Sequence, residues 1–270
     1  MTEVPSPKSE VRSRESERFG LGTSDFGRTI KAVVEYDGTA YHGFQVQAGR
    51  RTIQGELERA LASVAQEEIR IVGAGRTDAG VHALGQVISF RTGWDRSLAV
   101  LQRALNAVLP RDIAIREMEE TPPDFHARYS AVSREYRYTI LNRPVRSPLA
   151  ERFAYHFATP LAVEPMAEAC GHLVGRHDFA SFGQPMKEDG STVRTIHRAR
   201  CWREGDYVYV DIVADAFLRR MVRRIVGGLL EVGTGRLSSE EFREIFLARN
   251  PSLIKVMAPP RGLCLVKVNY

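Results

Sequence analysis

Cysteine is scarce in this 270-residue chain, and its pattern excludes two common classes of protein. Only Cys170, Cys201 and Cys264 are present, far apart and odd in number. None forms a CxxC pair, so we expect neither a disulfide framework nor a zinc knuckle, but reduced thiols in the core. The seven histidines show neither HxxxH nor HxH spacing, and the sequence therefore predicts no metal site.

Long hydrophobic runs are also absent. No stretch approaches the roughly 20 apolar residues that cross a bilayer, and the first ten residues lack the apolar core of a secretory signal. With 43% hydrophobic and 26% charged residues, the composition is that of a globular protein. We therefore expect a cytoplasmic protein.

The sequence has no strong excess of one charge sign. The net charge is +5 and the pI is about 9.2, and most of the basic residues are arginine. The planar guanidinium group suits phosphate contacts because it donates parallel hydrogen bonds. A charge this modest is compatible with a nucleic-acid partner but does not demonstrate one.

Two halves with a similar order of elements follow a polar tail. Residues 1–27 are rich in Ser, Glu, Arg and Gly and have little periodic hydrophobicity, so we expect them to be disordered. In the first half, helical spacing marks residues 53–64 and 98–108, and strand patterns mark residues 30–36, 69–73, 86–90 and 113–118. In the second half, helical patterns lie at 165–174, 217–232 and 239–248, and strand patterns at 136–141, 192–202, 207–213 and 263–268.

This order predicts an α+β fold. We expect two ferredoxin-like or RRM-like halves with mainly antiparallel sheets, residues 28–122 and 123–270, divided near Thr121-Pro122-Pro123. A cleft between two such halves is a natural place for a functional site.

The glycine-rich stretch of residues 73–80 is similar to a phosphate loop but fails both tests for one. A dinucleotide-binding fingerprint that starts at Gly73 needs glycine at position 78, which is Asp78, and a Walker loop needs Gly-Lys-Ser/Thr. What remains is a turn that presents Arg76 and Asp78 after a strand. Taken alone, the turn favours a structural interpretation in which Thr77 or Asp78 is a cap.

Four segments in register change that interpretation. They are residues 36–45 (YDGTAYHGFQ), 75–83 (GRTDAGVHA), 125–131 (FHARYSA) with 136–138 (YRY), and 217–227 (FLRRMVRRIVG). In this order they resemble the tRNA pseudouridine synthase A (TruA) family, and the resemblance runs from about residue 29 to the C-terminus. One departure is Phe44, which stands where many members have Trp.

The resemblance implies an activity and a partner. Uridines 38, 39 and 40 of the tRNA anticodon stem-loop would be isomerised to pseudouridine without a cofactor or metal. The N-glycosidic bond breaks, the uracil turns, and C5 is joined to C1′ of the ribose. The resemblance also implies the pseudouridine synthase fold, with a central catalytic cleft, and a homodimer in which one tRNA contacts both subunits.

By resemblance, Asp78 is the catalytic nucleophile. A carboxylate can form a covalent intermediate or stabilise positive charge on a sugar; attack on the sugar, attack on the base and abstraction of a sugar proton all stay open. Each route needs an anionic Asp78 that is partly shielded from water, and therefore a cation nearby. One such pair at ~4 Å is worth on the order of 4 kcal/mol at an effective dielectric constant of ~20, before desolvation.

The resemblance assigns this cation to Arg223. It belongs to a group of four arginines in the predicted late helix, of which we expect two to be solvated: Arg219, Arg220, Arg223 and Arg224.

The resemblance also places Tyr136 in the base pocket, where its ring would stack on uracil for roughly 1–3 kcal/mol and its hydroxyl would assist removal of the C5 proton. Alternation along the strand does not separate Tyr136 from Tyr138, and an ordinary core tyrosine is the alternative. Leu263 resembles the apolar residue under the uracil. The uracil has to leave its stack to reach a cleft, so phosphate contacts must hold the RNA. We expect Arg76 beside the flipped base, and backbone contacts from Arg128, Arg219 and Arg220.

Two alternative functions stay open. One is a related enzyme that acts on another RNA. The other is a non-catalytic RNA-binding protein that assists tRNA folding, which would have no need of a carboxylate in its cleft.

Overall fold

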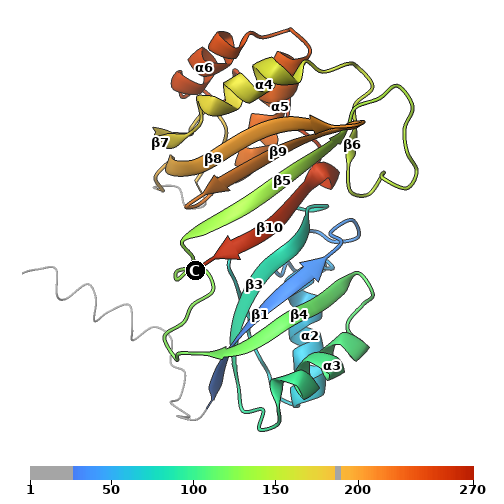
Figure 1. Ribbon diagram of the computed structural model, residues 1–270. Helices are drawn as coiled ribbons and strands as arrows, with labels where there is room; N and C mark the ends of the chain where they lie inside the picture. The colour runs from blue at the N-terminus through green and yellow to red at the C-terminus, as the bar shows by residue number, and fades with distance from the viewer. Residues whose placement is uncertain (1–26, 186–189) are drawn as a thin grey trace, which may run out of the picture.

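In the described part of the chain, ten strands form one continuous and mostly antiparallel sheet (Figure 1). The computed structural model describes residues 27–185 and 190–270. Eight strands follow one another in the order β4-β1-β3-β10-β5-β9-β8-β7, while β2 pairs with β3 and β6 pairs with β5. The predicted α+β fold class with mainly antiparallel pairing is confirmed. Apart from Gly27, the predicted tail of residues 1–27 lies outside the described residues.

The first half contains four strands and two helices: β1 (Arg28–Tyr36), α2 (Ile53–Ala65), β2 (Val72–Gly73), β3 (His82–Thr92), α3 (Leu98–Val108) and β4 (Ile113–Thr121). From Ile30 to Tyr36, buried apolar residues of β1 alternate with partly exposed residues, as the strand pattern predicts. Thr52 caps α2 by accepting the N–H of Gly55 at 3.3 Å. Helices α2 and α3 lie side by side against this part of the sheet (Figure 1).

The second half contributes the remaining elements: β5 (Ser133–Leu141), β6 (Tyr155–His156), α4 (Val163–Gly171), β7 (Gly175–Asp178), β8 (Val193–Glu204), β9 (Tyr207–Ala214), α5 (Met221–Gly233), α6 (Ser239–Leu247), the 3-10 turn η1 (Pro260–Gly262) and β10 (Leu263–Asn269). Helices α4, α5 and α6 pack on one another over the sheet (Figure 1). Helix α5 lies deepest, because ten of its 13 residues are buried.

Strand β10 joins the halves. It runs parallel to β3, with Cys264 opposite His82, and antiparallel to β5, with Leu263 opposite Tyr138. Periodicity predicts this strand but not its partners, since a strand pattern does not say which strands pair. Residues of β3, β5 and β10 are therefore neighbours in space, although the chain separates them widely. The division into residues 28–122 and 123–270 stays a prediction.

The late helix starts later than predicted. Its expected start was residue 217, but α5 begins at Met221. Arg220 adopts a left-handed backbone with φ 64°, and the N–H of Arg219 donates to the carbonyl of Gln184 at 3.0 Å. Both arginines consequently lie in a loop before the helix.

Three other expectations about elements are corrected. The strand expected at 69–73 shrinks to Val72–Gly73, because the N–H of Ile71 donates to the Glu58 carboxylate at 3.1 Å instead of to a strand. The helix expected at 165–174 ends at Gly171. Strands β6 and β7 were not predicted, because two and four residues are too few to show a period.

The structure also bears on two expected absences. Cys170, Cys201 and Cys264 are free, and the first two are buried. Among the residues that the structure describes, no helix is long and apolar enough to span a membrane.

Candidate active site

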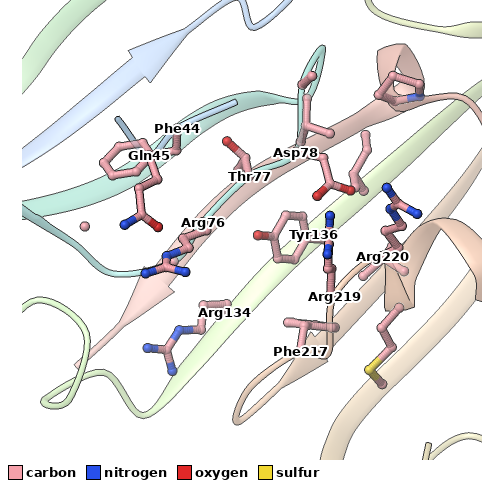
Figure 2. Close-up of a pocket in the computed structure, with 18 of the residues that line it drawn as sticks. Phe44, Gln45, Arg76, Thr77, Asp78, Arg134, Tyr136, Phe217, Arg219 and Arg220 are labelled. Carbon is pink, nitrogen blue, oxygen red and sulfur yellow. The ribbon is translucent and has the colours of Figure 1, made fainter. Parts of the chain in front are cut away.

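A cleft of about 680 Å³ takes its walls from both halves of the chain (Figure 2). Its lining comes from the loops after β1 and β2, from β5 and β10, and from the loop that leads into α5. The cleft is lined by all eight residues that the sequence singled out: Asp78, Tyr136, Arg223, Arg76, Leu263, Arg128, Arg219 and Arg220. The structure thus brings the predicted residues together, and their individual roles stay predictions.

The loop that carries Asp78 is anchored by its neighbour Thr77. The Thr77 side chain is buried and shares a hydrogen bond of 2.8 Å with the hydroxyl of Tyr36 on β1. The Thr77 carbonyl accepts the N–H of Phe44 at 3.1 Å. Gly43 has φ +91°, and a Cβ there would lie 2.7 Å from the Thr77 carbonyl oxygen. Thr77 therefore anchors the turn through its hydrogen bonds, and the side chain of Asp78 lines the cleft.

Asp78 forms an ion pair with Arg223. The Nη1 atom of Arg223 lies 3.2 Å from Oδ2 of Asp78, and its Nε donates to the carbonyl of Ala258 at 2.8 Å. The Arg223 side chain is 11% exposed and that of Asp78 is 32% exposed. The attraction is weaker than between fully buried charges, because Asp78 keeps contact with water. The pair nevertheless holds a charged carboxylate at the cleft wall in a defined orientation.

Tyr136 lies on β5 and forms part of the cleft, whereas Tyr138 does not. The Tyr136 ring meets Phe217 edge to face, with centroids 5.0 Å apart and an interplanar angle of 84°. Burial, assisted by the nearby Tyr36 and the charge of Asp78, raises the pKa of Tyr136 well above its ordinary value. Tyr138 is fully buried and donates to the carbonyl of Pro259 at 2.8 Å. Tyr138 is therefore the core tyrosine, and Tyr136 is the one available to a ligand.

His82, at the end of the GRTDAGVHA motif, connects three segments behind the cleft. Its Nδ1 accepts the N–H of Gly38 at 3.1 Å, and its Nε2 lies 3.2 Å from the carbonyl of Arg261. Burial lowers the pKa of His82, and the nearby Asp37 carboxylate opposes this only in part. We therefore assign the neutral form at neutral pH. Nδ1 also lies 3.1 Å from Oδ1 of Asp37, so the Gly38 N–H and this carboxylate favour opposite protonation of that nitrogen.

The remaining predicted residues lie around this centre. Leu263 is buried at the start of β10, directly after η1. The rim consists of four exposed arginines, Arg76, Arg128, Arg219 and Arg220. Arg224 turns away from the cleft, with its Nη1 3.4 Å from the carbonyl of Pro251.

Most of the other cleft residues were not singled out from the sequence, and two of them, Arg134 and Phe217, bear on the surroundings of Tyr136. Arg134 lies two residues before Tyr136 on β5, so strand alternation places both on the same face of the sheet. That spacing was a usable signal for Arg134. Phe217 was predicted to lie inside a helix. Because α5 begins only at Met221, Phe217 lies in the preceding loop, where its ring contacts that of Tyr136.

These features define a class of protein. A carboxylate paired with an arginine, an aromatic pocket beside it and a rim of arginines are typical of an enzyme that acts on a nucleic-acid base. Within residues 27–185 and 190–270, no group of three His, Cys, Asp or Glu side chains could hold a metal ion.

Comparison with known proteins identifies the family. The family model for tRNA pseudouridine synthase matches residues 32–130 and 169–270. The chain is 40% identical over 243 residues to tRNA pseudouridine synthase A of Thermoanaerobacter sp. (strain X514), across 90% of this chain and 100% of that protein. It is 43% identical over 244 residues to the protein of the same name from Geobacter sp. (strain M21), across 90% and 99%. With that of Methylococcus capsulatus it shares 46% identity over 237 residues, 88% of each chain. This chain belongs to the tRNA pseudouridine synthase family, and it is an isomerase.

Proposed function

We propose that the enzyme converts uridines 38, 39 and 40 of the tRNA anticodon stem-loop to pseudouridine, with Asp78 as the nucleophile. The observation that carries the proposal is the Asp78–Arg223 ion pair at 3.2 Å in a cleft walled by Tyr136 and Leu263. A non-catalytic RNA-binding protein would gain nothing from an anion at the centre of such a cleft, because the carboxylate repels the phosphates of RNA.

The reaction asks for little beyond the groups that line the cleft. The N1–C1′ bond breaks and a C5–C1′ bond forms, while one proton leaves C5 and one is gained at N1, so the product is an isomer of the substrate. In the described residues, Oδ1 of Asp78 has no hydrogen-bond partner, because Arg223 binds Oδ2. That oxygen is available to attack C1′ of the sugar or the base ring, and either attack splits one difficult step into two.

Tyr136 supports the reaction by binding rather than by acting as a base. Because burial raises the pKa of Tyr136, its hydroxyl holds its proton in the free enzyme at neutral pH. The phenol can take the C5 proton only after it has lost its own, and burial opposes that loss. Stacking of the uracil on this ring, which Phe217 supports from its edge, is the role that the geometry favours.

Two further features belong to the proposal. We expect a homodimer in which one tRNA contacts both subunits, and a cytoplasmic location. Light scattering of the full chain should then give a mass near twice the 30.3 kDa of one chain. A mass of one chain, with activity intact, would remove the dimer from the proposal without affecting the chemistry.

The positions are tested by mapping pseudouridine in a tRNA transcript after incubation with the purified enzyme. We expect pseudouridine at 38, 39 and 40 when these positions carry uridine, and none when the same positions carry cytidine. Modification only at other positions would contradict the proposed target while keeping the chemistry. Tight tRNA binding without any pseudouridine would favour the alternative of a non-catalytic RNA-binding protein.

A further inference from the structure

Three arginines gather at one end of the cleft, and no carboxylate pairs with them. Arg76 lies in the catalytic loop, Arg128 in the segment after β4, and Arg134 on β5. In the described part of the chain, none of the three makes a salt bridge, in contrast to Arg223, which pairs with Asp78. Three positive groups thus share one end of the cleft without a salt bridge. The charge of the Asp215 carboxylate acts on Arg134, but its Oδ1 already accepts the N–H groups of Thr195 and Ala216.

Arg134 is the fixed member of this group. Its Nη2 donates to the carbonyls of Arg128 at 2.7 Å and Ala74 at 3.0 Å, and its Nη1 donates to those of Asp215 at 2.7 Å and Ala131 at 3.3 Å. These neutral acceptors hold the guanidinium in place but do not cancel its charge. Burial lowers the pKa of Arg134, which reflects the cost of keeping this cation away from water.

Arg76 and Arg128 are the free members. No described residue forms a hydrogen bond with either guanidinium group, and both residues are exposed, so their donors are available to solvent or to a ligand. Burial and, after it, the charge of Arg128 lower the pKa of Arg76, which shows that the two cations lie close enough to repel each other. Arg128 is also adjacent to Arg134, because its carbonyl accepts a hydrogen bond from the Arg134 guanidinium. Like charges at this separation are stabilised by an anion between them, and a phosphodiester with two terminal oxygens matches guanidinium forks.

The group lines the same cleft as Tyr136. In Figure 2, Arg76 and Arg134 lie on the side of Tyr136 that its hydroxyl faces, whereas Arg220 lies on the other side of the ring. A uracil stacked on Tyr136 carries its sugar and the two flanking phosphates with it. A phosphate on the hydroxyl side of the ring would lie on the side of Arg76 and Arg134.

We propose that Arg76, Arg128 and Arg134 form a binding site for one backbone phosphate directly next to the flipped uridine. The proposal rests on the proposed function, since it takes the ligand to be RNA with a base in the cleft. Arg134 supplies a fixed charge, and Arg76 and Arg128 close on the phosphate from the loop and the rim. Holding this phosphate fixes the sugar at Asp78, so the site should affect both binding and turnover.

The test is a double-mutant cycle between protein and RNA. Anticodon stem-loop RNAs carry one neutral methylphosphonate, either 5′ or 3′ of the target uridine, and are compared with the natural RNA. For the wild type we expect one of the two linkages to lower kcat/KM about 10-fold, the effect of losing a charge-assisted hydrogen bond. Arg128→Gln should be slower on natural RNA and show almost no further loss at that linkage, because partners in contact are not additive.

Two further variants serve as a control for charge and as a test of Arg134. Arg103→Gln removes the same charge from the exposed face of α3, outside the cleft, and should show the full wild-type loss at the sensitive linkage. Arg134→Lys keeps a charge but cannot make the four carbonyl contacts that fix its position, so we expect a loss smaller than in the wild type. If Arg134→Lys does not fold, as circular dichroism would show, Arg128→Gln carries the test alone.

The result that would overturn the site is a methylphosphonate loss in Arg128→Gln equal to that of the wild type, or no loss at either linkage. Failure of the proposed function has a different signature, namely no pseudouridine from the wild type on natural RNA. The same cycle is therefore also measured as Kd in the Asp78→Asn background, where turnover is not needed. Non-additive Kd values support the phosphate site, and additive values refute it.

Discussion

Asp78 and Arg223 lie 145 residues apart in the chain, and each is held by a different neighbour. Thr77 anchors the loop of Asp78 against β1, and the carbonyl of Ala258 orients the guanidinium of Arg223. Removing Arg223 leaves the carboxylate in place but without its counter-charge and without a fixed direction. The four arginines of the rim are unchanged in such a variant.

We therefore expect Arg223→Ala to lower the single-turnover rate by about 10²–10³, the usual effect of removing one preorganised charged donor, with a much smaller change in tRNA affinity. Rapid-quench assays and filter binding measure the two quantities. Arg224→Ala is the matched control, because its guanidinium lies near the Pro251 carbonyl, outside the cleft. An unchanged single-turnover rate would remove Arg223 from the site.

Tyr136 permits a sharper separation of roles. If its ring stacks on the uracil and its hydroxyl is not a base, Tyr136→Phe should keep most of the single-turnover rate. Tyr136→Ala should lose roughly 1–3 kcal/mol of base binding. Single-turnover rates measured at several tRNA concentrations give both values. A Phe variant as inactive as the Ala variant would show that the hydroxyl takes part in the chemistry.

At the scale of single residues, the sequence predicted which residues line the cleft, but not how deeply each side chain is buried or what holds it. The motif match placed all eight candidate residues in one cleft. It could not separate Tyr136 from Tyr138 on physical grounds, because both point to the same side of β5 and only the packing of Pro259 and Phe217 distinguishes them. The spacing of Arg134 from Tyr136 was a signal that went unused, and the carbonyls that hold its guanidinium come from three other segments, which the sequence does not show to be neighbours.

At the scale of elements, the turn after β1 and the catalytic loop support each other. A methyl group at Gly43 would lie 2.7 Å from the Thr77 carbonyl oxygen and 3.3 Å from the carbonyl carbon of Asp78. Gly49, in the same connection, has φ +68° and no atom within 4 Å of an added Cβ. The two glycines share the left-handed backbone but differ in what surrounds them.

Gly43→Ala should therefore move the loop of Asp78 and lower turnover at least tenfold, whereas Gly49→Ala should cost only the ~1 kcal/mol of a left-handed alanine in stability. Turnover and urea unfolding of the two variants are compared side by side. Equal losses of activity would mean that strain in the backbone, and not the contact with the catalytic loop, is responsible.

Elements with several turns or long alternation were predicted well, and short or capped ones were not. Helices α2 and α3 have the expected positions, since their apolar residues recur at helical spacing. The late helix lost its first turn to the left-handed Arg220, a backbone state that periodicity does not show. The pairing of Gln184 with Arg219 contributes to the same change.

At the scale of the whole molecule, β10 lies between β3 of the first half and β5 of the second, and the sheet is continuous across the two halves through this strand. His82 on β3 links the β1 turn at Gly38 with the η1 turn at Arg261, next to β10. Because burial lowers the pKa of His82, the unfolded state binds a proton more readily than the folded state below the ordinary histidine pKa of about 6.5. The contribution of His82 to the free energy of unfolding is therefore complete above that pH, and it is lost as the pH falls below it.

We expect the free energy of unfolding to fall between pH 7.5 and pH 5.5, and to fall less steeply in His82→Gln. Urea unfolding at a series of pH values measures the two slopes, and His197→Gln, an exposed histidine on β8, provides the control. Parallel slopes in the wild type and His82→Gln would show that the buried imidazole does not contribute to the acid sensitivity.

The proposed chemistry depends on the carboxylate of Asp78, and the variant Asp78→Asn removes that group. The amide keeps the size of the side chain and removes the nucleophile and its charge. We expect no detectable pseudouridine at tRNA positions 38, 39 and 40 in a single-turnover reaction, with tRNA binding equal to or tighter than that of the wild type. Pseudouridine formed by Asp78→Asn at a rate near that of the wild type would contradict it.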